Sequence, residues 1–461
     1  MTTLTEVRAV LEARLPQLLA EHRVPGAAWG ILHDDQIVDG AAGLLNTATG
    51  VDATPDSLFQ IGSITKLWTG TLVLQLVDEG RIDLDVPVRT YLPEFTLGDQ
   101  DAAATITTRQ LLNHTAGFEG DIFTDTGVGD DCLEKFVATL HDLPQLFPPG
   151  EQFSYNNAGY CVLGRLVEVL RGASYDECLR THLIKPLGLT HAAVSPYEAI
   201  LYRVAVGHLD GEPAPIWSFA RSNAPAGSLL SMRARDLLAF ARMHLRDGLA
   251  EDGTRVLAPG TAELMRRREV DLPYLGLMGT SWGLSFERFD TPDGALVGHD
   301  GNTIGQAAYL RMVVEDGLAV TLLTNGGDAM ALYRDVFALV LGELGRVPLP
   351  ELPTPPEHPE PVDARRFVGT YTSRVADLTL TQDDDGRLWL EQTPKGELAE
   401  MVGESDRKEL VHFRGDSLIP LEPEQGIYLP HAFVGDDGTG RARYLHVGRA
   451  VRRAGTSTSS A

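Results

Sequence analysis

The feature that most limits the fold of this chain is a run of prolines in its last third. Seven of the fourteen residues of PLPELPTPPEHPEP (348–361) are proline. Proline fixes φ and lacks a backbone N–H, so this segment is expected to be an extended, stiff connector. We therefore predict two units, residues 1–346 and 363–455, joined by a linker at 347–362. Residues 456–461 are predicted to be a disordered tail.

The first unit begins and ends with strand patterns and is helical in between. Residues 1–23 have the apolar spacing of an amphipathic helix, and residues 105 to about 250 read mostly as helices and loops. Strands are predicted at 27–33, 37–43, 281–289, 295–301, 307–314 and 318–325, and helices at 63–79 and 329–344. This pattern predicts an α/β fold with one antiparallel sheet flanked by helices and an all-helical insert, in which the two ends pack together.

The unit after the linker contains short alternating segments. Turn sequences separate them, DDDG at 383–386 and GDDGTG at 435–440. The expected strands are 367–373, 376–382, 387–393, 410–415 and 442–448. Segments of this length and spacing predict a small all-β barrel or sandwich.

Charge and cysteine content exclude several classes of function. The net charge of −25 over 461 residues disfavours nucleic-acid partners and anionic membranes. No run approaches the length of a membrane span, and the N-terminus lacks the pattern of a secretory signal. Three cysteines do not suggest a disulfide framework. We therefore expect a cytoplasmic protein, with no membrane partner and an oligomeric state that the sequence leaves open.

The stretch QIGSITKLWTG (60–70) places Ser63 three residues before Lys66 at the start of a predicted helix. Positions i and i+3 share a helix face, so the amine can reach the hydroxyl. A serine is a poor nucleophile without a neighbouring base, and lysine becomes that base only when burial or positive charge lowers its pKa. The alternative is a helix-capping Ser63 and a solvated Lys66.

Two further stretches contain candidate site residues. In PPGEQFSYNNAGY (148–160), a lysine ammonium beside Tyr155 would make its phenol lose a proton more easily and relay it. Asn157 can bind an amide or ester carbonyl. In ALVGHDGNTIG (295–305), His299 and Gly301 end a predicted strand, where glycine lets a substrate approach the backbone. Taken singly, each is better explained by a loop tyrosine, a capping asparagine or a structural histidine.

Together the three stretches resemble the serine β-lactamase and penicillin-binding-protein superfamily, in particular its class C-like branch. That pattern is S-x-x-K, then Y-x-N, then Lys, Arg or His followed by x-G. The resemblance covers about residues 5 to 346 and includes LLNHTAGF (111–118) and PAGSLLSMRARDLLAF (225–240). The β-rich unit after the linker resembles the lipocalin-like domain that some members carry.

The resemblance implies a role for each motif residue. Ser63 would attack an acyl carbon, and Lys66 and Tyr155 would handle its proton. The backbone N–H groups of Ser63 and Asn302 would form the oxyanion hole. Asn157 would orient the substrate amide or ester.

The third motif departs from the pattern of true β-lactamases. His299 stands where these enzymes carry a Lys or Arg that pairs with a substrate carboxylate, which lowers the expectation of efficient β-lactam hydrolysis.

Two other residues are possible candidates. GTSWG (279–283) matches the G-x-S-x-G nucleophile elbow, but the following residues read as a strand where an elbow needs a helix. We therefore interpret Ser281 as structural, and likewise His114 in LLNHTAG. The sequence contains no HExxH, paired CxxC or phosphate-cradling loop, so we expect no metal or nucleotide cofactor.

The motifs leave the fate of the acyl group open. We expect a small-molecule or peptidyl acyl substrate, and favour hydrolysis of small esters or amides because it needs the least specialised pocket. The alternatives are an ATP-independent acyltransferase or peptide-cyclising thioesterase that delivers the acyl group to an amine, and a non-catalytic binding protein on the same fold. The barrel is expected to shape access to the site. Its basic cluster, Arg443, Arg449, Arg452 and Arg453, would meet a substrate carboxylate or else form a solvated strand edge.

Overall fold

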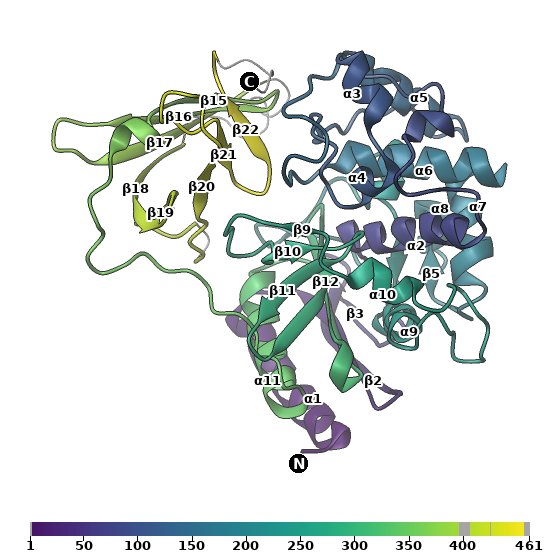
Figure 1. Cartoon of the computed structure of the whole chain (residues 1–461). Helices are drawn as coiled ribbons and strands as arrows, with labels where there is room; N and C mark the ends of the chain where they lie inside the picture. Colours follow the sequence, from purple (N-terminus) through teal and green to yellow (C-terminus); the bar gives the residue numbers. More distant parts are fainter. Residues whose placement is uncertain (1, 396–405, 425, 456–461) are drawn as a thin grey trace.

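The computed structural model describes residues 2–395, 406–424 and 426–455. The predicted tail at 456–461 lies outside these residues. In Figure 1 the chain forms a larger part with a central sheet and helices, and a separate barrel to which a long connector leads. Residues 345–363, which include the prolines, form neither helix nor strand.

The central sheet is antiparallel and joins the two ends of the first unit. The strand order is β3-β2-β1-β14-β13-β12-β11-β10-β9, and β1 pairs with β14 in the register Trp29↔Leu322. The strands are β1 (Gly26–His33), β2 (Gln36–Asn46), β3 (Val51–Asp52), β9 (Val270–Asp271), β10 (Ser281–Trp282), β11 (Glu287–Thr291), β12 (Gly294–Thr303), β13 (Gln306–Val313) and β14 (Leu318–Thr324). The α/β fold predicted from the sequence is confirmed.

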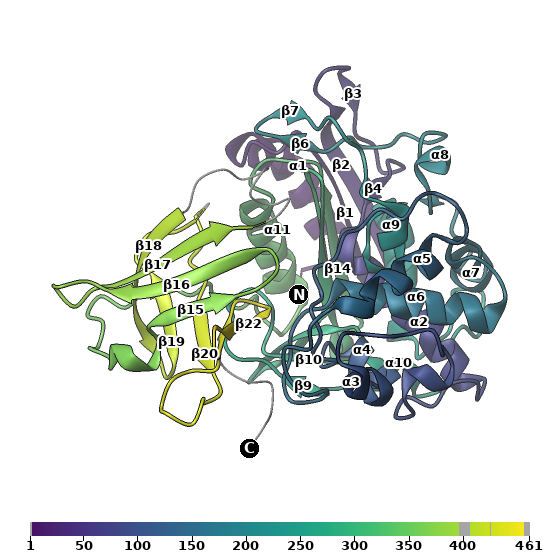
Figure 2. The ribbon, with the colours of Figure 1, turned by 90° about the horizontal axis from the view of Figure 1, so that it is seen from above.

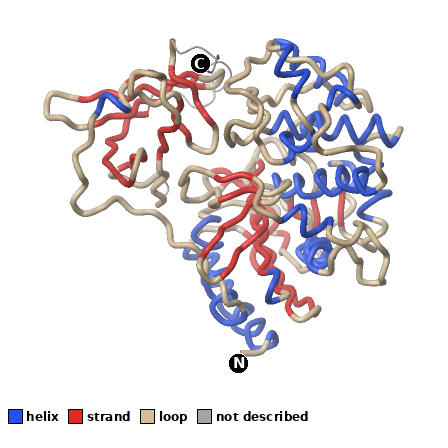
Figure 3. Tube along the Cα trace, in the orientation of Figure 1, coloured by secondary structure: helices blue, strands red, loops and turns tan. Residues whose placement is uncertain are grey.

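Helices cover both faces of this sheet. On one face, α1 (Leu4–Glu21) and α11 (Ala329–Leu344) pack on alternate strand residues such as Trp29 and Tyr309. The other face carries α2 (Thr65–Asp78), α6 (Asn157–Arg171) and α9 (Ala234–Leu245) within the larger core. The two layers are visible in Figure 2, and Figure 3 shows most of the helices to the right of the strands, with α1 and α11 apart from them at the lower left.

The insert between β2 and β9 contains mostly short helices. They are α3 (Gln100–Thr105), α4 (Thr108–Leu112), α5 (Cys132–Ala138), α7 (Tyr175–Leu179), α8 (Pro196–Ala199) and α10 (Thr261–Arg266). The insert is not made of helices alone. It also holds a small sheet of β4 (Phe59–Gln60), β8 (Ser231–Met232) and β5 (Ala192–Ala193), and a pair formed by β6 (His208–Leu209) and β7 (Glu212–Pro213).

The single strand predicted at 281–289 is wrong. The chain reverses within it, so that β10 pairs antiparallel with β11 and Ser281 lies opposite Arg288. Ser285 adopts a positive φ of 75°, and the N–H of Gly283 donates to the carbonyl of Phe286 at 2.7 Å. The alternating apolar pattern continues through this turn, which is why it reads as one strand.

The unit after the linker is a closed antiparallel barrel with its own core. Its strands are β15 (Gly369–Thr372), β16 (Ala376–Gln382), β17 (Leu388–Pro394), β18 (Asp406–Arg414), β19 (Ser417–Pro420), β20 (His431–Val434), β21 (Tyr444–His446) and β22 (Ala450–Arg453). The predicted all-β barrel is confirmed. The sequence missed β19, β20 and β22, each of four residues, because so short a segment shows little alternation.

No helix among the described residues is long and apolar enough to cross a membrane.

Candidate active site

Ser63 and Lys66 lie at the start of α2, on the face of the sheet opposite α1 and α11. Ser63 sits in a single 3-10 turn (Gly62–Ile64) that leads into α2. The ammonium of Lys66 donates to Ser63 Oγ at 3.0 Å and to the carbonyl of Ala226 at 2.6 Å. Ser63 is partly exposed, whereas Lys66 is fully buried. Burial lowers the pKa of Lys66 to about 7, so a large share of the amine is neutral at neutral pH and can accept a proton.

Tyr155 lies beside this pair. Its ring centroid is 4.8 Å from Lys66 Nζ. Burial raises the pKa of the Tyr155 phenol, and the neighbouring Ser63 side chain opposes this only in part. The phenol therefore stays protonated near neutral pH, contrary to the idea that the lysine charge eases its ionisation, and it is suited to donate a proton.

The ring of Tyr155 is held by aromatic neighbours. His114 stacks on it with a centroid distance of 4.4 Å, and Trp282 packs edge-on at 5.9 Å. The Nδ1 of His114 accepts the backbone N–H of Asn156 at 2.9 Å, and burial lowers the pKa of His114. His114 is thus a neutral packing and hydrogen-bonding group behind Tyr155.

Asn157 begins α6 and contacts Asp121, a residue the sequence did not single out. Its Nδ2 donates to Asp121 Oδ1 at 2.9 Å. The preceding Asn156 supplies the helix cap, since its side chain accepts the N–H of Gly159 at 2.7 Å. The two asparagines of the second motif therefore have different tasks.

Strand β12 brings the third motif against the turn that holds Ser63. A Cβ atom at Gly62 would lie 2.5 Å from the backbone nitrogen of Asn302, and one at Gly301 would lie 3.0 Å from that of Ser63. Only glycine permits this approach. The backbone nitrogens of Ser63 and Asn302 are consequently neighbours, as two donors of one oxyanion hole must be.

His299 is not a cation in this site. Its Nδ1 donates to the carbonyl of Asp300 at 2.6 Å, and its ring lies edge-on to Trp282. Burial lowers the pKa of His299 to about 3, and the charge of Lys66 acts in the same direction. A neutral imidazole cannot replace the Lys or Arg that pairs with a carboxylate.

The barrel contributes a cation instead. The guanidinium carbon of Arg449, in the turn between β21 and β22, is 4.7 Å from the ring centroid of Tyr155. Arg449 Nε donates to Asp121 Oδ2 at 2.9 Å. Of the predicted basic cluster, Arg453 serves another purpose, because its Nε and Nη1 donate inside the barrel to the carbonyls of Ala442 and Val368.

The same turn of the barrel is hydrogen-bonded to the loop that carries Tyr155. The N–H of Tyr155 donates to the carbonyl of Gly448 at 3.0 Å, and the N–H of Ala450 donates to Ser154 Oγ at 3.1 Å. The Nε2 of His446 donates to the carbonyl of Phe153 at 2.7 Å. These contacts join residues far apart in sequence, and no local pattern signals them.

Ser281 lacks the surroundings of a nucleophile. It lies in β10, is followed by a hairpin turn where an elbow has a helix, and its hydroxyl donates to Asp290. A carboxylate whose pKa is lowered by hydrogen bonds to Ser281 and Arg288 is a poor base.

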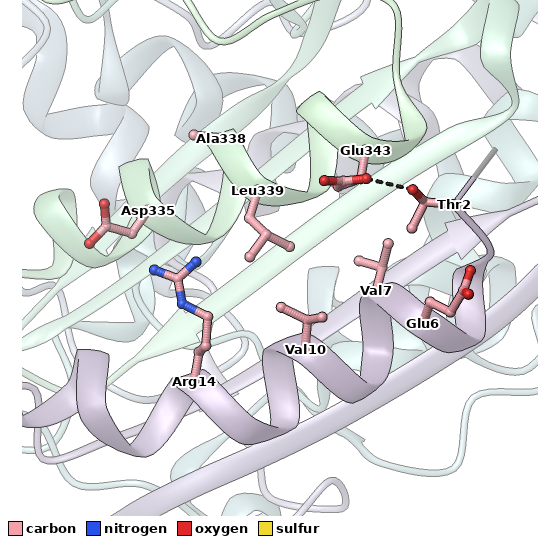
Figure 4. A pocket seen from close by; sticks show the side chains of 9 residues that line it. All are labelled: Thr2, Glu6, Val7, Val10, Arg14, Asp335, Ala338, Leu339 and Glu343. Carbon is pink, nitrogen blue, oxygen red and sulfur yellow. Dashed lines mark hydrogen bonds between the residues drawn. The ribbon is translucent and has the colours of Figure 1, made fainter.

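A surface groove between α1 and α11 lies away from these residues (Figure 4). Val10 and Leu339 form part of its wall. Because α1 and α11 cover the opposite face of the sheet from α2, this groove does not belong to the Ser63 site.

Residues 11–342 match the Beta-lactamase family. The chain belongs to this family. Penicillin-binding protein 4 of Amycolatopsis lactamdurans is 45% identical over 367 residues, which cover 78% of this chain and 96% of that protein. The solved structure of SurE with D-Leu is 32% identical with a TM-score of 0.78, and the match covers 97% of this chain and 99% of that one.

A class C β-lactamase from Rhodobacter sphaeroides shares the fold. It is 21% identical with a TM-score of 0.59, and covers 73% of this chain and 99% of the β-lactamase. Family membership makes the chain one of the β-lactamase-fold serine enzymes. SurE matches nearly the full length of both chains, so that similarity includes the barrel.

Proposed function

We propose that this β-lactamase-family protein transfers acyl groups through an ester on Ser63. Ser63 Oγ attacks the carbonyl carbon of the donor while its proton passes to the neutral amine of Lys66. The N–H groups of Ser63 and Asn302 stabilise the oxyanion. The protonated phenol of Tyr155 gives a proton to the leaving group, and the Lys66 ammonium restores it. The 3.0 Å bond between Lys66 and Ser63, with the low pKa of this lysine, supports these roles.

The acceptor we propose is an amine that also carries a carboxylate. The observation behind this choice is Arg449, a cation beside Tyr155 in a site where His299 is neutral. Arg449 donates to Asp121 through Nε and Nη2, so the N–H groups of Nη1 are the donors proposed to bind the acceptor carboxylate. The related SurE has been solved with D-Leu, an amino acid that has both groups. This choice departs from the expected hydrolysis of small esters or amides, which was favoured because it needs the least specialised pocket.

In the second half-reaction the acceptor amine attacks the carbonyl carbon of the acyl-Ser63 ester. The Ser63–acyl bond breaks, Ser63 Oγ regains a proton and the product is an amide. Attack by water would instead give the acid, and the motif residues serve both outcomes. A peptide whose own terminal amine reaches the ester would be cyclised by the same step.

The proposal is tested by measuring how the acyl group divides between the acid and the amide product. A peptidyl ester is supplied with rising concentrations of D-leucine, L-leucine or D-leucinamide, and acid and amide are quantified. We expect D-leucine to give amide and D-leucinamide, which lacks the carboxylate, to give much less. Acid alone at every concentration would identify a hydrolase. Absence of an acyl adduct on Ser63 in intact-mass spectra would favour a non-catalytic binding protein.

A further inference from the structure

The carboxylate of Asp121 lies between two groups that come from different parts of the chain. Its Oδ1 accepts a hydrogen bond from Asn157 Nδ2 at 2.9 Å. Its Oδ2 accepts one from Arg449 Nε at 2.9 Å, and Arg449 Nη2 is 3.3 Å from Oδ1. Asp121 therefore holds the amide of the second motif and the cation of the barrel at the same time.

The bond to Asp121 decides which end of the Asn157 amide faces the rest of the site. A carboxylate paired with a guanidinium only accepts hydrogen bonds, whereas an amide has a donating NH₂ and an accepting oxygen. The NH₂ must therefore face Asp121, and the alternative flipped amide would set two oxygens against each other. Oδ1 of Asn157 is left turned the other way, as an acceptor.

We propose that Asp121 is a positioning residue that makes Asn157 an acceptor for a substrate N–H while it holds Arg449 over Tyr155. The substrate group that meets Asn157 is then an amide or amine N–H. A carbonyl oxygen, which the sequence suggested for this position, would need the donating end of the amide. The inference rests on the proposed acyl transfer and adds the class of group that the site selects.

The test compares two acyl donors that differ in one atom. One is an activated ester of an N-acylamino acid, and the other has oxygen in place of the amide N–H nearest the scissile carbonyl. We expect the unaltered protein to favour the N–H donor by about tenfold in kcat/KM, the size of one hydrogen bond. Asp121→Asn should remove most of this preference, because two amides pair in either orientation and Asn157 is then free to turn.

Two control variants separate the contact of Asp121 with Asn157 from its contact with Arg449. Asp142→Asn breaks another ion pair to the barrel, that between Asp142 and Arg374 at 3.4 Å, and should keep the preference. Arg449→Gln leaves the bond between Asp121 and Asn157 in place. It should lower the rate yet also keep the preference. Equal loss of preference in Asp121→Asn and Arg449→Gln would show that Asp121 acts only through Arg449, and would overturn the proposal.

Intact-mass detection of acyl-Ser63 separates the remaining outcomes. If neither donor acylates the unaltered protein, the proposed function fails and this inference with it. If acyl-Ser63 forms but the unaltered protein shows no preference, or Asp121→Asn retains it, only the inference is overturned. Should thermal unfolding show that Asp121→Asn does not fold, Asn157→Ala decides the question, since a preference that survived loss of the acceptor would contradict it.

Discussion

The backbone N–H of Tyr155 donates a 3.0 Å hydrogen bond to the carbonyl of Gly448. Tyr155 belongs to the β-lactamase-like unit and Gly448 to the barrel, so the candidate site is built from both. Next to Gly448, Arg449 reaches the ring of Tyr155 and the carboxylate of Asp121. The barrel thus contacts groups proposed to take part in the chemistry.

Ser63→Ala is expected to abolish the acyl adduct and to lower turnover of an activated ester by at least about 10³-fold, because only binding and oxyanion groups remain. Intact mass and peptide mapping measure the adduct. Ser281→Ala is the matched control and should keep both adduct and rate. An adduct mapped to Ser281 would refute the assignment.

Lys66→Ala and Tyr155→Phe are expected to impair acylation severely, and the double variant should be little worse than the more impaired single one. Residues that move one proton act as a unit, so their effects on the rate do not add. Single-turnover acylation rates of the unaltered protein, the two single variants and the double variant measure this double-mutant cycle. Additive losses would mean that the two side chains work separately, for example in substrate binding.

Acylation should increase with pH and level off above about 7, since Lys66 must be neutral to accept the Ser63 proton and its pKa is lowered to about 7. The positive charge of Arg449 contributes to this lowering. Arg449→Gln removes that charge, so the pKa of Lys66 should rise and the midpoint of the pH profile should move upward. An unchanged midpoint would argue against the coupling of these two residues.

Gly301→Ala should lower the thermal midpoint and the activity together. Its Cβ atom would lie 1.9 Å from the carbonyl oxygen of Ile61, so β12 or the turn before α2 must move. Gly342 in α11 is the contrasting position, because a Cβ atom there meets nothing within 4 Å. Gly342→Ala should stabilise the protein by about 0.5–1 kcal/mol through the unfolded chain and leave activity intact. Calorimetry of both variants checks this.

Removal of the barrel by truncation after residue 346 should lower kcat/KM by about 10²-fold or more, because the loop of Tyr155 loses its hydrogen bonds to His446, Gly448 and Ala450. Circular dichroism establishes that the remaining unit is folded. Truncation after residue 455 is the control and should leave kcat/KM unchanged. Unchanged turnover and specificity in the shorter protein would reject a role of the barrel in the site.

The parts of the site that could be predicted are those encoded over a few residues. The i, i+3 spacing predicts that the Lys66 amine reaches the Ser63 hydroxyl, and Lys66 Nζ lies 3.0 Å from Ser63 Oγ. Gly301, two residues after His299, predicts a close approach of two backbone segments. This approach occurs between Gly301 and the turn that holds Ser63. The all-β character of the last unit follows in the same way from alternating segments and turn sequences, whereas its closure into a barrel is seen only in the structure.

What escaped prediction depends on packing between distant segments. Nothing near Asp121 indicates its partners, because Asn157 is 36 residues away and Arg449 is 328 residues away. Burial likewise reversed one expectation, because the pKa of the Tyr155 phenol is raised. Burial also keeps His299 neutral, which strengthens its departure from the Lys or Arg of the related enzymes. Desolvation depends on the assembled core, so these states cannot be read from residue types.

The position of Gly448 and Arg449 in the barrel has a consequence during protein synthesis. The ribosome completes residues 1–346, with all three motifs, before it reaches the β21–β22 turn. A nascent or prematurely ended chain therefore presents Ser63 and Lys66 without the partner that anchors Tyr155 and without the barrel cation. The complete site therefore exists only after translation has passed residue 449, and shorter chains are expected to have the lowered activity of the truncated protein.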